Sequence, residues 1–110
     1  MNYRFDIELL NEVDTFLSGL DHKTREKVLY NLWKARMVID PELFKKINNE
    51  IWEFRTLFRG KQIRLLAFWD KNSQKNKIVI CTHGVIKKDW KVPRKEVEKA
   101  IRIMNEYYQQ

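Results

Sequence analysis

Three consecutive segments between residues 52 and 86 have the residue pattern of strands, and they restrict the fold of the chain more than any other feature. Apolar and charged residues alternate from Trp52 to Phe58, and a strand pattern resumes from Gln62 to Trp69 after a tight turn at Gly60. A polar loop then leads to a third apolar segment, from Ile78 to Ile86. Strands joined by such short connections pair antiparallel, so the sequence predicts an antiparallel sheet.

Segments with the periodicity of helices precede and follow these strands in the chain. Apolar residues recur every three or four positions from Glu8 to Leu20, and Asp21 is suited to cap a second helix that ends at Asp40 and Pro41. Pro93 predicts the start of a last helix, because proline is favoured at the first helical position. In the second helix, Asn31 is expected to face solvent. The residues of that helix expected in the core are Val28, Leu29, Leu32, Trp33 and Ala35.

The order of these elements indicates the fold class. Residues 3–7 alternate between apolar and charged side chains, which predicts an early strand. The predicted order is strand, helix, helix, three strands and helix, in an α+β fold whose antiparallel or mixed sheet has about four strands. All 110 residues are expected to form one domain, since a chain of this length buries a single core.

The composition is typical of a folded protein without disulfides. Apolar residues make up 44% of the chain, which has only 3 Gly and 2 Pro. The single cysteine, Cys81, excludes an internal disulfide, and the Cys and His spacing matches no zinc motif. The apolar runs are too short to span a membrane, and no signal peptide opens the chain. We therefore expect a reduced, cytoplasmic protein without a structural metal.

The formal net charge of +7 is concentrated in one stretch of the chain. Between Arg55 and Arg94 there are eleven Lys or Arg residues and two acids, which gives +9, whereas the rest of the chain sums to −2. A positive balance of this kind indicates attraction to an acidic partner, such as a nucleic acid, an anionic membrane or an acidic protein. The excess is local, so it favours one basic surface over a general increase in solubility.

Several short motifs follow one another in an order known from one protein family. They are Ile51-Trp52-Glu53-Phe54-Arg55, Gly60-Lys61-Gln62-Ile63-Arg64, His83-Gly84-Val85-Ile86-Lys87-Lys88, and Pro93 with Ala100. Through these motifs the chain, from about residue 3 to residue 105, resembles the phage-derived HigB-like branch of the RelE/ParE toxin superfamily. The resemblance implies a RelE-like α+β domain with two N-terminal helices packed on the sheet.

The resemblance also implies a function and a set of partners. The protein would be the toxin of a type II toxin–antitoxin pair, an endoribonuclease that cleaves mRNA on the translating ribosome and needs no cofactor. A cognate antitoxin, expected to be HigA-like with a helix-turn-helix, would silence it. The expected partners are therefore the antitoxin, mRNA and the ribosome. DNA would be contacted only indirectly through the antitoxin complex, and no membrane is involved.

The basic residues of the predicted sheet suit this chemistry. Cleavage of RNA without a metal uses the ribose 2′-hydroxyl as nucleophile, and fixed cations lower the barrier by stabilising charge on the five-coordinate phosphorus. The predicted catalytic cations are Arg55, Arg64 and the pair Lys87 and Lys88, because Arg contacts two phosphate oxygens and Lys supplies charge and a proton. Arg64 is the only charge in its strand and must find a partner or an anion. Glu53 is expected beside Arg55 on an exposed, mostly charged face.

The proton acceptor has more than one candidate. His83 has an ordinary pKa close to neutrality and precedes Lys87 by four residues, so it is included among the predicted catalytic residues. If His83 points into the core, it is a structural residue instead. A lysine whose pKa is lowered by neighbouring cations, or the ribosome itself, is the alternative base.

Four further residues are predicted to bind RNA. Arg59 and Lys61 flank the turn at Gly60, where they are suited to phosphate contacts. Trp90 lies in a basic segment immediately before Lys91, and we expect its ring to stack on a base while Lys91 contacts phosphate.

Two other functions are compatible with these residues. One is a ParE-like inhibitor that binds DNA gyrase through protein contacts and performs no chemistry. The other is an inactive nucleic-acid-binding module. Several cations on the predicted strands, together with the pair Lys87 and Lys88, favour the nuclease.

Overall fold

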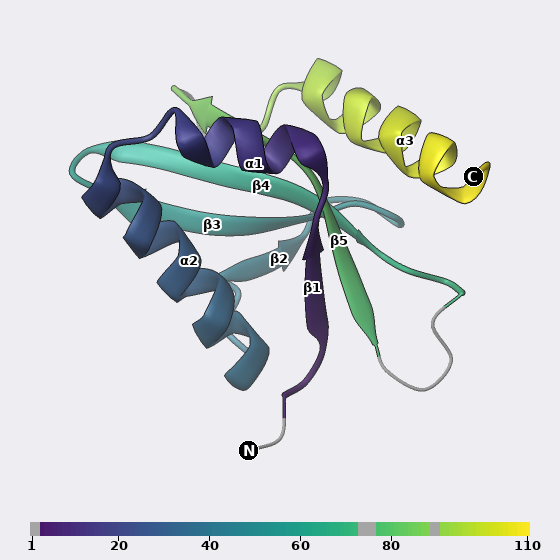
Figure 1. The fold of residues 1–110 in the computed structure, drawn as a ribbon, viewed down its shortest axis with the longest axis horizontal. Coiled ribbons are helices and arrows are strands. Elements are labelled where there is room, and N and C mark those ends of the chain that lie inside the picture. The colour runs from purple at the N-terminus through teal and green to yellow at the C-terminus, as the bar shows by residue number, and fades with distance from the viewer. Residues whose placement is uncertain (1–2, 73–76, 89–90) are drawn as a thin grey trace.

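The computed structural model describes residues 3–72, 77–88 and 91–110, which form helices packed on a mixed sheet (Figure 1). This arrangement confirms the predicted α+β fold class. Compared with the predicted order, the structure has one additional strand, and its first strand begins at Asp6 rather than at Tyr3. In chain order the elements are β1 (Asp6–Leu9), α1 (Asn11–Ser18), α2 (His22–Met37), β2 (Phe44–Lys46), β3 (Trp52–Phe58), β4 (Lys61–Trp69), β5 (Ile78–Lys87) and α3 (Arg94–Tyr108).

The five strands form one sheet with the order β1-β5-β4-β3-β2. β1 is parallel to β5, and the other neighbouring strands are antiparallel. The sequence interpretation placed β2 in a connecting segment, because a strand of three residues is too short to show an alternating pattern. A turn follows β2, in which Asn48 Oδ1 accepts hydrogen bonds from the backbone N–H groups of Glu50 and Ile51.

The turn between β3 and β4 is as tight as predicted and fixes the register of the two strands. Arg59 and Gly60 have φ angles of 51° and 77°, which are typical of the type I′ turns that join two-residue hairpins. The register that follows places Arg55 directly opposite Arg64. Side chains of directly opposite residues point to the same face of a sheet, so these two guanidinium groups share one face.

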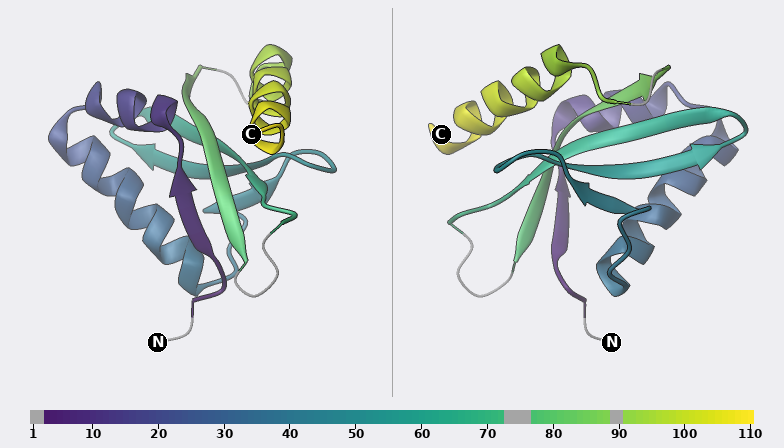
Figure 2. Two further views of the ribbon diagram at one scale, coloured as in Figure 1. Left: turned by 45° about the vertical axis from the view of Figure 1, so that its right-hand side comes forward. Right: turned by 180° about the vertical axis from the view of Figure 1, so that it is seen from behind.

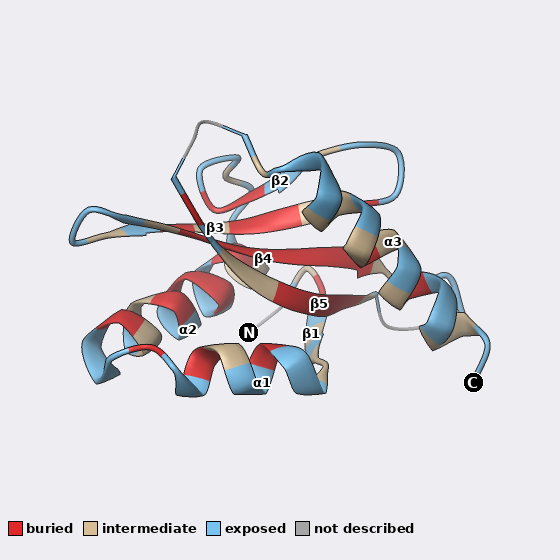
Figure 3. Ribbon diagram, turned by 90° about the horizontal axis from the view of Figure 1, so that it is seen from above, coloured by how far each residue is buried: buried red, intermediate tan, exposed pale blue. Residues whose placement is uncertain are grey.

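The helices lie in two layers, with α1 and α2 on one face of the sheet and α3 on the other (Figures 2 and 3). Under α1 and α2 the core is rich in aromatic rings, and Phe44 stacks on Phe54 with ring centroids 4.3 Å apart. α3 packs mainly on β4 and β5. The buried residues of the smaller core under α3 are Ile51, Leu66, Phe68, Ile80, Ala100 and Met104.

The helix ends agree with the predictions to within about three residues: α1 begins at Asn11 rather than at Glu8, and α2 ends at Met37 rather than at Asp40. Asp21 caps α2 as expected, since its carboxylate accepts a hydrogen bond from the backbone N–H of Thr24. The hydrogen bond from the Thr24 hydroxyl and, after it, this backbone bond lower the pKa of Asp21. Pro93 lies one position before the helix rather than in its first turn, and its carbonyl accepts from the N–H of Glu96.

The buried face of α2 agrees only in part with the predicted one, since Val28, Leu32 and Ala35 are buried as expected. Leu29 and Trp33, expected in the core, are each 43% exposed. Asn31, expected in solvent, is buried and donates a hydrogen bond of 3.0 Å to Thr56 Oγ1 in β3. The prediction was wrong for Leu29, Trp33 and Asn31 because α2 carries large apolar side chains on two faces, so the apolar pattern alone does not determine which face meets the sheet. The buried residues of α2 are Thr24, Val28, Asn31, Leu32 and Ala35.

Gly84 of β5 permits the close approach of α1 to the sheet, because a Cβ at this position would overlap the ring of Phe16. We expect Gly84→Ala to lower the free energy of unfolding by about 1–3 kcal/mol through overpacking. Urea unfolding measures this loss. In a Phe16→Ala background the same substitution should cost less than about 0.5 kcal/mol, because the two sites are then uncoupled. Equal losses in both backgrounds would contradict the contact.

Candidate functional site

Three of the predicted catalytic side chains lie on the sheet face that carries α3, and we call Arg55, Arg64 and Lys87 the cationic cluster. Arg55 of β3 is directly opposite Arg64 of β4, and Lys87 of β5 is directly opposite Gln62 of β4. Gln62 Oε1 accepts a hydrogen bond of 3.3 Å from Arg64 Nη2, so Gln62 and Lys87 point to the same face as Arg64. Three neighbouring strands therefore bring these cations together.

Arg64 lies in the central strand and is only 3% exposed. Its Nε is 2.8 Å from Glu53 Oε1, in the geometry of an ion pair rather than of an aligned hydrogen bond. Its Nη1 donates to the carbonyl of Ile63 at 3.1 Å. Burial lowers the pKa of Arg64 and Glu53 opposes that shift, but a guanidinium stays charged at neutral pH. Arg64 is thus a cation in a fixed position.

Glu53 is a residue of this site that sequence reasoning placed wrongly. It was expected on an exposed face beside Arg55, but it is 9% exposed and pairs with Arg64 instead. The spacing of two puts Glu53 and Arg55 on the same face of β3, and the register places Arg64 on the diagonal from Glu53. The lone charge of Arg64 in an apolar strand was the available signal, since a buried Arg requires a partner.

Arg55 borders a pocket of about 310 Å³ between β2, β3 and the segment before α3. Its Nη1 donates to the carbonyl of Pro41 at 3.2 Å. Its Nε is buried and has no hydrogen-bond partner within the described part of the chain. Cations outnumber acids around this pocket, so it suits an anion. The residues that line it with Arg55 are Lys45, Lys46, Ile47, Glu53, Lys91 and Val92.

His83 lies beneath the first turn of α3 and is directly opposite Leu66, next to a bulge in β5. Its Nδ1 is 2.9 Å from Thr82 Oγ1, and its Nε2 is 3.4 Å from Glu96 Oε1. The side chain is 4% exposed, so the imidazole is covered rather than open to the pocket at Arg55. Burial lowers the pKa of His83, Lys99 lowers it further, and Glu96 opposes both.

The covered imidazole predicts that acid weakens the fold. In the unfolded chain His83 has its ordinary pKa of 6.5, and in the folded chain its pKa is lower. Above the unfolded value His83 is neutral in both states and has no effect. As the pH falls below that value, the unfolded chain binds a proton that the folded chain does not, and the free energy of unfolding decreases until the pH reaches the folded pKa.

Urea unfolding at about pH 7.5 and about pH 5.5 measures this loss. His83→Gln should reduce it, and an unchanged pH dependence in that variant would contradict the assignment.

Arg59 and Lys61 lie at the tip of the β3–β4 hairpin, apart from the cationic cluster. Lys61 points to the face that carries α1 and α2, where its Nζ is 3.8 Å from Asp21 Oδ1. Arg59 is exposed, and its guanidinium carbon is 5.1 Å from the centroid of the Phe58 ring. The structure therefore does not join these two predicted RNA-binding residues to the others.

The remaining predicted residues lie between β5 and α3. Lys88 is exposed and follows the end of β5 directly, next to Lys87 of the cationic cluster. Lys91 lines the pocket at Arg55. Trp90 lies outside the described residues, so its stacking on a base stays a prediction.

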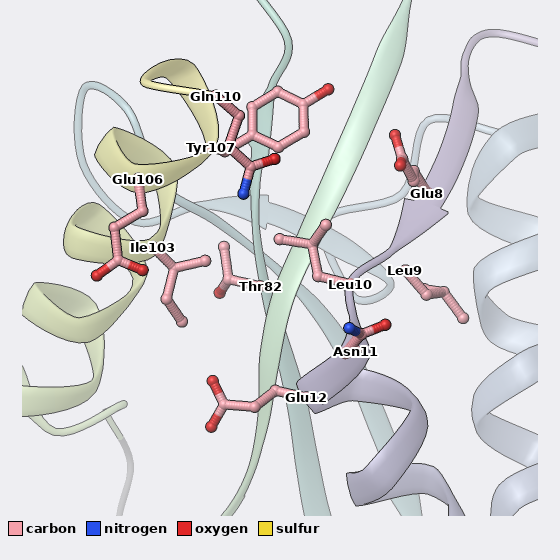
Figure 4. A pocket seen from close by; sticks show the side chains of 10 residues that line it. All are labelled: Glu8, Leu9, Leu10, Asn11, Glu12, Thr82, Ile103, Glu106, Tyr107 and Gln110. Atoms are coloured by element: carbon pink, nitrogen blue, oxygen red, sulfur yellow. The ribbon is translucent and has the colours of Figure 1, made fainter.

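A second hollow, of about 450 Å³, lies between α3 and the junction of β1 with α1 (Figure 4). It shares no lining residue with the pocket at Arg55. The carboxylates of Glu8, Glu12 and Glu106 line it, and they would repel a phosphate. The larger volume of this hollow therefore does not make it a candidate for RNA binding.

Residues 15–105 match the model of a family described as phage derived protein Gp49-like (DUF891). The chain therefore belongs to the phage-derived Gp49-like family. The matched residues of this Gp49-like chain include the whole cationic cluster, Glu53 and His83. A search of curated proteins found no match. The match agrees with the phage-derived part of the resemblance, and the HigB-like branch stays a prediction.

Two properties of the described part of this Gp49-like protein bear on the sequence predictions. No helix in residues 3–72, 77–88 and 91–110 is long and apolar enough to cross a membrane. The same residues contain no group of three or more His, Cys, Asp or Glu side chains arranged to hold a metal ion.

Cys81 is fully buried, and burial raises the pKa of its thiol, so it behaves as a small apolar residue.

Proposed function

We propose that this Gp49-like protein is the toxin of a type II toxin–antitoxin system and an endoribonuclease that cleaves mRNA on the translating ribosome. The observation that supports the proposal best is the direct opposition of Arg55 and Arg64, with Lys87 on the same face of the next strand. Like charges opposite each other destabilise a sheet. A bound anion would relieve this repulsion, and RNA phosphate is an anion that the Arg fork fits.

Positive charge exceeds negative charge around the cationic cluster, so the cluster can bind such an anion. Glu53 offsets one positive charge through its ion pair with Arg64. Arg55 forms no ion pair among the described residues, and Lys45 and Lys91 line the pocket beside it. The pocket is therefore net positive when it is empty. A phosphodiester placed there would receive charge-assisted hydrogen bonds from groups that the fold already holds in position.

The proposed reaction needs only groups of the RNA and of the protein. The 2′-oxygen forms a bond to phosphorus while the bond to the 5′-oxygen breaks, which leaves a 2′,3′-cyclic phosphate and a 5′-hydroxyl. Arg55 and Arg64 would stabilise the negative charge that develops on the phosphoryl oxygens. Lys87, with Lys88 beside it, would supply a proton to the departing 5′-oxygen.

The proton of the 2′-hydroxyl requires an acceptor. His83 is close to the cluster along β5, but its Nε2 faces Glu96 beneath α3. For His83 to act as the base, the first turn of α3 would have to move so that Nε2 could reach the RNA. A lysine of the pocket or a group of the ribosome would serve without that movement, and the ribosome would also position the mRNA.

The proposal includes a regulatory partner. A toxin of this kind requires a cognate antitoxin, which we expect to be a small HigA-like protein with a helix-turn-helix. That protein, rather than this chain, would contact DNA.

Induction of the chain in growing cells tests the proposal. Pulse labelling should show that protein synthesis stops before DNA synthesis, and mapping of transcript ends should show cuts within translated frames. Arrest of DNA synthesis first, with intact mRNA, would contradict the proposal and favour inhibition of DNA gyrase. Growth without arrest would favour an inactive nucleic-acid-binding protein.

A further inference from the structure

The outer side of α2 carries an exposed apolar stripe that the core does not use. Leu29 and Trp33 are each 43% exposed and Tyr30 is 49% exposed. Tyr30 and Trp33 contact each other, with ring centroids 5.8 Å apart. Val38 and Ile39, which follow the helix, are 42% and 83% exposed. We call these five residues the α2 stripe.

The α2 stripe is separate from both the core and the cationic cluster. α2 already packs on the sheet through its other side, where Val28, Leu32 and Ala35 are buried. It lies in the layer opposite α3, on the far face of the sheet from the cluster (Figure 3). Neither folding nor the proposed cleavage explains why two aromatic rings should be exposed here. Exposed apolar side chains that gather on one surface, as the neighbouring rings of Tyr30 and Trp33 do, mark interaction surfaces.

The surroundings of the stripe are basic. α2 contains five Lys or Arg residues and one Glu, and positive charges still outnumber negative ones when the pairing of Arg36 with Asp6 and the presence of Asp40 after Ile39 are counted. Lys27 lies over the ring of Tyr30, with its Nζ 5.1 Å from the ring centroid, and Lys34 follows Trp33 directly and is exposed. A partner therefore needs apolar side chains for the stripe and acidic side chains for its rim.

These features select one class of partner. A second copy of the chain would place one basic α2 against another, and like charges across an interface are unfavourable. RNA would suit the lysines and the rings but not the aliphatic Leu29, Val38 and Ile39, which offer a base nothing to stack on. Trp and Tyr anchors beside aliphatic residues are typical of the centre of a protein interface. We infer that the α2 stripe docks an acidic amphipathic helix of another protein, with apolar residues at helical spacing and Asp or Glu beside them.

Site-specific photo-crosslinking in the native host tests this inference. The full chain carrying Trp33→p-benzoylphenylalanine is produced from its own promoter, irradiated, and its crosslinked peptides are sequenced. We expect the crosslink in an acidic amphipathic segment of another protein. The same crosslinker at Lys95, an exposed position on α3, is the control and should not give that product. Crosslinks to RNA, to a second copy, or to a basic segment would overturn the inference, and so would the absence of any crosslink.

The crosslinked segment is then synthesised and its affinity for the purified chain is measured. Trp33→Ser combined with Tyr30→Ser should weaken binding at least about tenfold, because aromatic anchors dominate such interfaces. Circular dichroism verifies that the variant is folded. Its mRNA cleavage should be unchanged, so failure of this inference and failure of the proposed nuclease would be distinguishable. An unchanged affinity would overturn the inference.

Discussion

Arg55→Gln is expected to slow mRNA cleavage by about 10²–10³-fold, the usual cost of removing one donor that stabilises charge in the transition state. Arg55 borders the pocket and forms no ion pair among the described residues, so its charge is available to a phosphate. The free energy of unfolding should change by no more than about 1 kcal/mol, because the lost bond to the carbonyl of Pro41 is offset by less repulsion from Arg64. Primer extension on mRNA in a translating extract measures the rate.

The matched control is Arg102→Gln on α3. Arg102 is exposed and pairs with Glu106 one helical turn away, so the same change of charge occurs at a position far from the pocket. We expect cleavage to fall less than about twofold in this variant, as for most surface substitutions. Equal loss of activity in both variants would show that the net charge matters rather than the placement of Arg55. Full activity in Arg55→Gln would remove Arg55 from the site.

Arg64→Met is expected to lower the free energy of unfolding by about 3–5 kcal/mol, because it leaves the buried carboxylate of Glu53 without its partner. A loss of this size lowers the Tm by more than about 10 °C in a domain of this length. Thermal unfolding followed by circular dichroism measures it. Arg94→Met is the control, since Arg94 forms an exposed pair with Glu98 and should cost less than about 0.5 kcal/mol.

A double variant separates the structural role of Arg64 from its proposed chemical role. Arg64→Met with Glu53→Leu replaces the whole buried pair by apolar side chains, and stability should return to within about 1 kcal/mol of the original protein. Cleavage should nevertheless stay at least about 10²-fold below the original rate, because the fixed cation is gone. A stable and fully active double variant would show that Arg64 only supports the fold. A stable Arg64→Met single variant would contradict the buried ion pair.

Sequence reasoning worked best where the local pattern determines the geometry. The tight turn at Gly60 and the alternation on either side of it predict a hairpin, and the hairpin places Arg55 near Arg64. Asp21 predicted the start of α2 because a carboxylate at that position satisfies free N–H groups. The register of β4 with β5 then places Lys87 on the same face as Arg64.

Other residues were placed wrongly because their positions depend on contacts between segments distant in the chain. Glu53 pairs diagonally across two strands with Arg64, which no periodicity reveals. The helix α2 carries apolar residues on both sides, and the contacts that bury one of them, such as the bond from Asn31 to Thr56, come from residues distant in the chain. Lys61 shares the basic stretch with the cluster but points to the other face, because successive residues of a strand alternate. Charge along the sequence therefore predicted a basic surface but not which of its residues converge.

The most direct test of the account is to map the 5′ ends of a defined mRNA after incubation with the purified chain and translating ribosomes. We expect new ends within the translated frame that carry a 5′-hydroxyl, with a 2′,3′-cyclic phosphate on the upstream fragment, and we expect these ends to form about 10²–10³-fold more slowly with Arg55→Gln. Intact mRNA with the original protein, under conditions in which the same preparation arrests growth when produced in cells, would contradict it.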